Sequence, residues 1–472
     1  MEVTKAFAAW AAETPVITSD VAMLRAQQAI YDVVACMVAG AGDEGSARLR
    51  STIAPYGSGP ATVIGSEAKA PTPWAALANG MAAHALDFDD NYLPGFTHAT
   101  AVLIPALLGL AEEIDATGRQ LMDAYIVGLE MHAAVGRGVN KAHYDMGWHA
   151  TSTVGCIGTA AACGRLLGLD ADRMTNALSL GVSMASGAKV QFGTMSKPFH
   201  AGMAAKNAVL AAQLARNGFQ ARDSALEAPL GFRDLYGGTK AQGWDRIVPI
   251  LGNPPAIEEF GLSPKLYPCC GSAHRVLDIV LALRKEHGFS ADDVLRVETL
   301  VEFVNKRNLM YDHPEQEMEA RFSMNYCVSL ALLYGRLSLT DFTPQAVHRS
   351  EVRKLLPLVT MDAHEEGAQG PDPTARLPHK ATISLKDGRI LSGSATWARG
   401  TIHNPFHEAD LNEKFRDCCE GFLTPSDFEA VQKILNNLAE LDSVRRLTRH
   451  LTFNAGSDRG ERFTDRYDKK AL

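Results

Sequence analysis

The apolar and polar residues between Thr18 and about Leu266 follow helical spacing almost throughout. Several of these segments are apolar nearly all round and rich in Ala, Gly and Met, which is typical of helices buried inside a protein. Thr18-Ser19-Asp20 supplies N-cap side chains before the first long apolar run, and Gly40 is a candidate terminator. Further helices are predicted over residues 72–86, 100–116, 120–135, 152–167, 171–186 and 202–217.

The pattern changes after Pro268. A helix predicted over residues 272–285 leads into a segment from Val297 to Phe303 in which β-branched and aromatic residues alternate with mostly polar ones, and this favours a strand. Asp387-Gly388 favours a tight hairpin turn. The other predicted strands cover residues 358–361, 381–385 and 390–394, the last two on either side of that turn.

This order of elements predicts a mainly α protein. Helical spacing returns from Asp410 to Leu451, so a mixed α+β segment is inserted between two helical ones. We therefore expect a large all-α domain built from both chain ends, residues 1–267 and 396–472, and a smaller α+β domain over residues 268–395. The length of 472 residues agrees with two domains, because a single core stops growing at roughly 250–300 residues.

Charge and cysteine usage narrow the possible partners and the compartment. The formal net charge of −8 argues against a nucleic-acid or anionic-membrane surface, which would need clustered Lys and Arg, so we expect a small-molecule partner. Eight cysteines without CxxC spacing, and no signal peptide after Met1, indicate the reducing cytoplasm. The longest apolar run, Ala99 to Ala111, is interrupted by Pro105 and is shorter than the roughly 20 residues that cross a bilayer, so no membrane span is expected.

Motifs for common cofactors and metals do not occur in the sequence. There is no GxxxxGKS/T loop, and the glycine groups at 57–60 and 136–138 do not complete a dinucleotide-binding fingerprint. HExxH, zinc-like cysteine spacing and GxSxG are missing as well. We therefore expect a protein that works without a cofactor and without a metal ion.

The first candidate for chemistry is the block HALDFDDN at residues 84–91, which His98 follows closely. Asp87, Asp89 and Asp90 leave an apolar helix together, and carboxylates at a helix C-terminus oppose its dipole, so they need cations or hydrogen bonds as compensation. A polar loop in which Asp87 caps backbone groups explains the pattern equally well. A magnesium or calcium site is disfavoured, because the spacing and glycine of an EF-hand are missing.

Two further blocks place His149 and Lys197 directly before predicted helices. The free N–H groups at the start of the helix after His149 would suit a substrate carboxylate, although a histidine at a helix start is more often structural. Lys197 lies among Gly, Met, Pro and Phe, so we expect it to be partly withdrawn from water and suited to anion binding or proton transfer. The alternative is a lysine with a buried stem whose ammonium reaches water.

The block KLYPCCGSAH, residues 265–274, lies at the predicted domain junction, where ligand sites are common. We interpret Cys269 and Cys270 as packing residues, because no base accompanies them. Tyr326 follows later, at a predicted helix start in the segment RFSMNY.

Taken together, five ordered blocks make the chain resemble the MmgE/PrpD family, which includes 2-methylcitrate dehydratase, cis-aconitate decarboxylase and iminodisuccinate epimerase. The blocks are HALDFDD at 84–90, Thr97-His98, SKPFHAG from 196, KLYPCCGSAH from 265 and ARFSMNY ending at 326. The resemblance implies a helical domain made from both chain ends, an inserted α+β lid domain, a cleft between them as the site, and usually a homodimer. By position, the family's active-site residues fall on Asp87, His98, His149, Lys197, Lys265 and Tyr326.

The resemblance implies a cofactor-independent lyase acting at the carbon next to a carboxylate in a small di- or tricarboxylic acid. Decarboxylation, dehydration and epimerisation of such acids all develop negative charge there, and cations must stabilise it. Lys197 and Lys265 would bind carboxylates. His98 and His149 would move protons, and Asp87 would orient a histidine or lysine.

Asn91, His274 and Tyr326 complete the predicted substrate-binding set with Lys265. Related lyases tend to have Thr at the place of Asn91, and His-Pro where this chain has His98-Ala99, so the substrate pocket is expected to differ. The first alternative function is an isomerase that epimerises an iminodicarboxylate such as iminodisuccinate. The second is a non-catalytic carboxylate-binding protein on the same scaffold.

Overall fold

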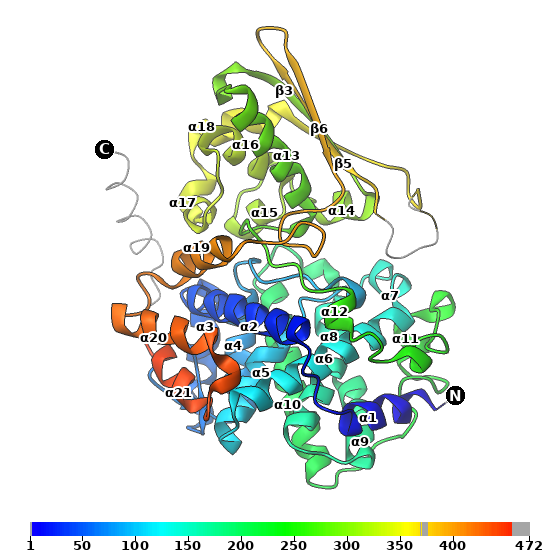
Figure 1. Cartoon of the computed structure of the whole chain (residues 1–472). Coiled ribbons are helices and arrows are strands. Elements are labelled where there is room, and N and C mark those ends of the chain that lie inside the picture. Colours follow the sequence, from blue (N-terminus) through cyan, green and yellow to red (C-terminus); the bar gives the residue numbers. More distant parts are fainter. Residues whose placement is uncertain (1, 369, 371–375, 456–472) are drawn as a thin grey trace. The chain divides into compact units, whose positions relative to one another are not determined.

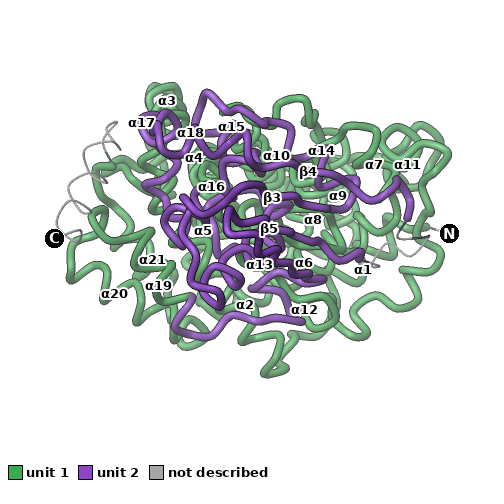
Figure 2. The backbone as a smooth tube through the Cα atoms, turned by 90° about the horizontal axis from the view of Figure 1, so that it is seen from above, with its two compact units in different colours: residues 1–264, 411–459 green, residues 265–410, 460–472 purple. Residues whose placement is uncertain are grey.

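The computed structural model describes residues 2–368, 370 and 376–455 (Figure 1). The described residues form two compact units, which Figure 2 colours separately. Unit 1 contains residues 2–264 and 411–455, and unit 2 contains the described residues between 265 and 410. The return to unit 1 comes at residue 411 and not at 396, because residues 396–410 pack with unit 2. In that segment the backbone N–H of Arg399 donates to the carboxylate of Asp278, and its guanidinium pairs with Asp410.

Unit 1 is a bundle of helices drawn from both ends of the chain (Figures 1 and 2). Its helices before the insertion are α1 Val3–Glu13, α2 Asp20–Ala41, α3 Glu44–Ile53, α4 Thr72–His84, α5 Thr100–Ile114, α6 Gly118–Val139, α7 Ala142–Asp145, α8 Ala150–Leu166, α9 Ala171–Met184, α10 Ser196–Arg216, α11 Phe232–Tyr236 and α12 Ala256–Glu259. After the insertion follow α19 Glu408–Cys419, which begins at the unit boundary, α20 Pro425–Asn436 and α21 Arg445–Thr448.

The periodic sequence pattern predicted most of these helices within a few residues. The hydroxyl of Ser19 caps α2 by accepting the N–H of Ala22 at 3.1 Å, as expected from the N-cap residues. Helix α10 begins at Ser196 and not at 202, so Lys197 lies in its first turn. The expectation of an all-α domain was wrong in one detail. Strands β1 Ala61–Thr62 and β2 Lys69–Ala70 form an antiparallel pair, too short to show alternation in the sequence.

Glycine allows α4 and α10 to approach very closely. A Cβ atom on Gly202 would lie 2.2 Å from the carbonyl oxygen of Leu77, and one on Gly80 would lie 2.8 Å from the Cα of Gly202. A larger residue at either position would push the two helices apart. This contact allows the first turn of α10 to meet the last turn of α4.

One helix among the described residues, α2, is long and apolar enough to cross a bilayer by length and composition alone. Of its most apolar window, 67% is buried inside unit 1. A core helix of a folded bundle passes the same test of length and composition, and burial of this kind is typical of one.

Unit 2 is an α+β unit built around one sheet. Its strands are β3 Val294–Val301, β4 Val359–Ala363, β5 His379–Leu385 and β6 Ile390–Ala395, in the order β4-β3-β5-β6. The pair β3–β4 is parallel, and the other two pairs are antiparallel. The helices are α13 Gly271–His287, α14 Phe303–Asn308, α15 Glu317–Arg321, α16 Met324–Tyr334, α17 Pro344–Val347 and α18 Ser350–Leu355.

The core of unit 2 lies where α13 and α16 contact the sheet and each other. The hairpin predicted at Asp387-Gly388 is confirmed: β5 and β6 pair directly, and Gly388 has a φ of +89°, which favours glycine. The strands predicted near Val297 and near residue 358 are confirmed as β3 and β4.

Candidate active site

Residues 85–90 leave the end of α4 as a buried turn that carries three acids. Asp87 adopts a left-handed conformation with φ of +50°, and its N–H donates to the carbonyl of His84 at 3.2 Å. Asp87, Asp89 and Asp90 are each at most 1% exposed. Carboxylates in this position need compensation, and the surrounding histidine, lysine and threonine side chains provide it.

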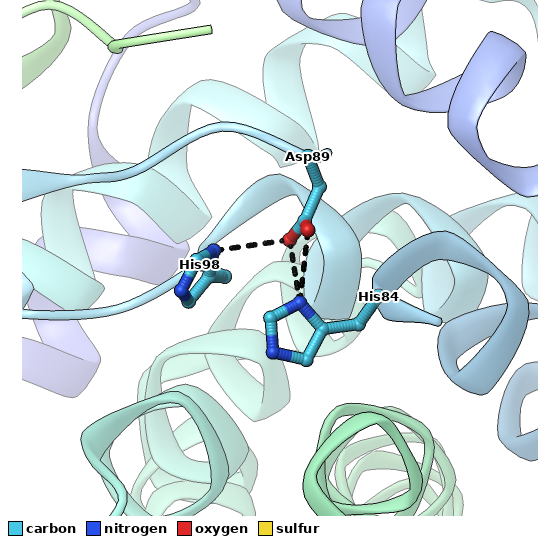
Figure 3. Close-up of side chains that lie close together, drawn as sticks. All are labelled: His84, Asp89 and His98. Carbon is cyan, nitrogen blue, oxygen red and sulfur yellow. Dashed lines mark hydrogen bonds and ion pairs between the residues drawn. The ribbon is translucent and has the colours of Figure 1, made fainter. Parts of the chain in front are cut away.

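The carboxylate of Asp89 contacts two neighbouring histidine rings (Figure 3). Nδ1 of His84 is 2.9 Å from both carboxylate oxygens, and Nδ1 of His98 is 3.2 Å from one of them. Burial by itself would raise the pKa of Asp89, but the two histidines outweigh this effect and hold that pKa well below its usual value. Asp89 is therefore ionised, accepts a hydrogen bond from His84 and has His98 beside it at ion-pair distance.

Lys197 contacts the opposite nitrogen of His84. Its ammonium donates to Nε2 of His84 at 2.9 Å and to the carboxylate of Asp87. Because an ammonium can only donate, Nε2 of His84 must present its lone pair, and the ring proton lies on Nδ1, facing Asp89. Burial lowers the pKa of His84 to about 3, with Lys197 adding to this effect and Asp89 opposing it, so the ring is neutral at pH 7.

His149 and His200 form a second pair of histidines beside this chain of hydrogen bonds. His149 directly precedes α8 and is 2% exposed, and its ring centroid lies 6.0 Å from that of His84. Nδ1 of His149 lies 3.1 Å from Nδ1 of His200, which is partly exposed. Burial, followed by the charge of Lys197, lowers the pKa of both rings, so one neutral nitrogen donates to the other.

By distance alone, His84, Asp89 and His98 could hold a metal ion, because one ligand atom from each lies within 4.8 Å of the others. A metal on Nδ1 of His84 would require Nε2 to carry the proton and to donate it to an acceptor. That nitrogen instead faces the Lys197 ammonium, which is a donor and whose charge opposes a cation. The hydrogen bonding therefore favours a proton-handling cluster over a metal centre.

Asp90 does not hydrogen-bond with His84, His98 or Lys197 and instead interacts with Thr100. Its Oδ2 accepts the hydroxyl of Thr100, which also lies 2.8 Å from the hydroxyl of Tyr125. Its Oδ1 has no hydrogen-bond partner among the described residues. Burial, reinforced by the charges of Asp32 and Asp89, raises the pKa of Asp90 to about 7.

The structure brings Asp87, His98, His149 and Lys197 together in unit 1, as the sequence blocks predicted. Asn91, which is partly exposed, follows the acidic turn in the same unit. Its backbone pairs with that of Ser263 through two hydrogen bonds of 2.9 Å.

The other predicted residues belong to unit 2, where they lie in its interior. Lys265 is 1% exposed. Nε2 of His274 lies 3.2 Å from the carbonyl oxygen of Cys269. The hydroxyl of Tyr326 donates to the carbonyl oxygen of Asp341 at 2.6 Å, and burial, with Asp341 adding to it, raises the pKa of this tyrosine. Burial also raises the pKa of the Cys269 thiol, in agreement with a packing role.

Comparison with known proteins identifies the family. Residues 5–245 match the MmgE/PrpD N-terminal domain, and residues 267–440 match the MmgE/PrpD C-terminal domain. The chain belongs to the MmgE/PrpD family. Its curated relatives include cis-aconitate decarboxylase of Homo sapiens, 30% identical over 395 residues that cover 80% of this chain and 79% of the relative. Cis-aconitate decarboxylase of Aspergillus terreus is 25% identical over 469 residues, which cover 94% of each chain.

In this MmgE/PrpD family member, sequence reasoning missed His84, Asp89 and His200 as separate site residues. His84 and Asp89 flank Asp87 in HALDFDD, and His200 follows Lys197 in SKPFHAG, so all three lay inside blocks that were singled out. The spacing of His84 and Asp89 was a further signal. His84 is the last residue of an apolar helix, and the turn after it brings Asp89, five residues later in the sequence, back into contact with its ring. The histidine pair across α8 and α10 has no such local spacing.

Proposed function

We propose that this protein is a cofactor-independent lyase that acts at the carbon next to a carboxylate in a small di- or tricarboxylic acid. Within that class, decarboxylation of cis-aconitate or a close analogue is the first candidate, since its curated relatives carry that name. The observation that carries the proposal is the buried chain Asp89–His84–Lys197, with His98 and His149 beside it. This cluster joins the ammonium of Lys197 to the neutral imidazoles of His84 and His149, which are able to exchange protons.

In a decarboxylation, the bond between a carboxylate carbon and its neighbour breaks, and its electron pair moves onto the remaining carbon framework. Carbon dioxide leaves, and one proton must then be added to carbon. The ammonium of Lys197 would stabilise the negative charge that develops. His149 or His98 would supply the proton, and Asp89 would hold His84 in the tautomer that accepts from Lys197.

The charges of the cluster favour proton uptake when an anion binds. Asp87 and Asp89 carry two negative charges against one positive charge on Lys197, and His84 and His149 are neutral. A bound carboxylate would add further negative charge in a site with little water. Protonation of a histidine would offset it, and that same proton would be in place for transfer to carbon.

For unit 2, the proposal follows the family resemblance: Lys265 would bind a second carboxylate, and His274 and Tyr326 would support it. Asn91 would line the substrate pocket in unit 1. The same resemblance favours a homodimer, and composition favours the cytoplasm. Each assignment can be tested by substitution, Lys265→Met first, with substrate affinity as the measurement.

Epimerisation of an iminodicarboxylate is the second candidate. A reaction of that kind needs two groups that exchange protons with the same carbon from different sides. The rings of His98 and His149 both lie near His84, at centroid distances of 4.4 Å and 6.0 Å from it. The presence of two histidines near one shared neighbour is the observation that supports the isomerase as the second candidate.

The test is to incubate the protein in deuterated water with cis-aconitate, 2-methylcitrate and iminodisuccinate, following mass changes by mass spectrometry. Loss of carbon dioxide from cis-aconitate with one deuterium bound to carbon is the expected result. Loss of water from 2-methylcitrate would keep the lyase and change its reaction. Deuterium exchange without loss of either would favour the epimerase. Binding without any reaction would leave the non-catalytic alternative.

A matched pair of variants assigns the activity to the cluster. Lys197→Met should lower turnover by about three orders of magnitude, and Lys206→Met should leave it unchanged. Lys206 lies on the same helix, nine residues further along, where its ammonium is 4.9 Å from the Trp74 ring centroid. Equal activity of the two variants would contradict the assignment.

A further inference from the structure

The acidic turn after α4 is held at every residue from 87 to 90. Asp87 accepts from Lys197, Asp89 from His84, and Asp90 from Thr100. Between them, the backbone carbonyl of Phe88 accepts the ammonium of Lys414 at 2.7 Å. This last contact joins residues 326 positions apart in the chain.

Lys414 lies on the buried face of α19 and is 4% exposed. Its ammonium pairs with Asp32 of α2 at 2.7 Å and lies 4.1 Å from the centroid of the Phe88 ring. Burial is the largest single influence and opposes the charged form, but Asp32 together with Cys36 and Cys418 outweighs it, and the pKa of Lys414 is raised. Lys414 is therefore a buried, charged lysine whose ammonium is held by Asp32 and by the carbonyl of Phe88. Its burial argues against a role at the protein surface.

The contact between Lys414 and the Phe88 carbonyl affects the turn because Phe88 lies between Asp87 and Asp89 in the chain. Its carbonyl belongs to the peptide group that leads into Asp89, and the preceding residue, Asp87, has a left-handed backbone conformation that L-residues with side chains rarely adopt. A buried carbonyl without a donor is unfavourable, so loss of Lys414 would favour rotation of this peptide group. Such a rotation would move both carboxylates.

We propose that Lys414, held in place by Asp32, is a positioning residue that keeps the turn 87–90 in its catalytic conformation. The inference rests on the proposed function, because the turn carries the acids of the proposed site. Lys414 acts through the turn and does not touch the substrate. The segment after the insertion thereby contributes to the reaction as well as to the bundle.

The experiment separates positioning from stability with single and double variants of the full-length protein. Lys414→Met and Asp32→Leu each leave one buried charge without its partner, so both should lower the thermal unfolding midpoint. The double variant carries neither charge and should recover much of that midpoint. Its kcat with cis-aconitate should nevertheless stay about tenfold or more below the parent, with KM changed far less.

Lys433→Met serves as the control, because Lys433 is an exposed lysine of the neighbouring helix α20, and its kcat and midpoint should match the parent. Recovery of kcat together with the midpoint in the double variant would overturn the proposal, since the pair would then act on stability alone. Equal kcat in Lys414→Met and the parent would overturn it as well.

A second readout does not depend on turnover. In proteins labelled with 15N at histidine, the parent should show the His84 Nδ1–H tautomer, and the double variant should show a mixture of tautomers or a shifted Nδ1–H proton. If the parent turns over none of the tested acids, the proposed function fails, but this measurement still decides the positioning role. An unchanged His84 spectrum in the double variant would contradict it.

Discussion

Two lysine–aspartate pairs are buried in unit 1, and they differ in the third partner of the lysine. The Lys197–Asp87 and Lys414–Asp32 side chains have the same exposures, 3% for each lysine and 2% for each acid. Each ammonium also lies near a phenylalanine ring. Lys197 contacts an imidazole nitrogen, whereas Lys414 contacts a backbone carbonyl.

The third partner distinguishes the chemical role proposed for Lys197 from the positioning role proposed for Lys414. An imidazole can take up a proton when a bound anion adds negative charge, so the state of His84 and the charge around Lys197 can change during a reaction. A carbonyl does not titrate, so the Lys414 contact keeps one state throughout. Burial and ion pairing alone do not distinguish the two lysines, and a sequence search for buried charges would group them together.

The largest expected effect is on Lys197. Replacing it with Met should lower kcat/KM about a thousandfold, since it removes a positioned donor from developing negative charge. Steady-state kinetics with the substrate identified above measure this. A loss of only about tenfold would place Lys197 in the same class as Lys414 and break the comparison.

Asp90, on the Lys414 side of the turn, should affect stability through pH. Its folded pKa of about 7 lies above the unfolded value, so the folded state retains a proton that the unfolded state releases, and this contribution is lost as pH rises from about 4 to 7. Asp90→Asn removes the penalty of the buried charge. Relative to the parent, its free energy of unfolding should increase by up to about 4 kcal/mol between pH 4 and pH 8.

Urea unfolding at both pH values measures this difference. Thr452→Ala, at an exposed hydroxyl far along the chain, provides a control whose difference from the parent should not depend on pH. If the difference in unfolding free energy between Asp90→Asn and the parent were the same at both pH values, Asp90 would be ionised in the folded state at low cost. Asp90 would then no longer differ from Asp89 in the direction of its pKa shift.

Asp89 lies on the Lys197 side. Asp89→Asn keeps the size of the side chain but removes the charge that accepts the His84 Nδ1–H, so kcat should fall about a hundredfold through loss of the fixed tautomer. The comparison is sharpened if KM changes little, because the histidine tautomer affects proton handling more than substrate binding. A wild-type kcat would show that Asp89 has only a structural role.

The smallest expected effect concerns substrate affinity. If a histidine takes up one proton when the anion binds, the dissociation constant should fall by at most about tenfold for each unit that pH is lowered from 8 to 6. Isothermal titration calorimetry in buffers of different ionisation enthalpy counts the protons directly. If no proton is taken up on binding, Lys197 alone would compensate the negative charge of the substrate.

Much of the fold could be predicted from the sequence, because helices and strands leave local periods. The spacing of apolar residues located α2, α4, α5 and the hairpin β5–β6 within a few residues. The β1–β2 pair was missed because two-residue strands have no period. The first turn of α10 was missed as well, since it begins with the polar residues Ser196 and Lys197, although a proline in a first turn is compatible with a helix.

By itself the sequence determined most of the longer helices, the strands of the insertion and the blocks that carry Asp87, His98, His149 and Lys197, whereas α1 and α3 were not predicted. Only the tertiary structure decided which nitrogen of His84 faces Lys197, that His200 lies against His149, and that Lys414 reaches Phe88. The physical reason is distance along the chain. Groups three or four residues apart interact within one helix and follow its period, whereas groups 51 to 326 residues apart meet only through helix packing, such as the glycine contact of α4 with α10.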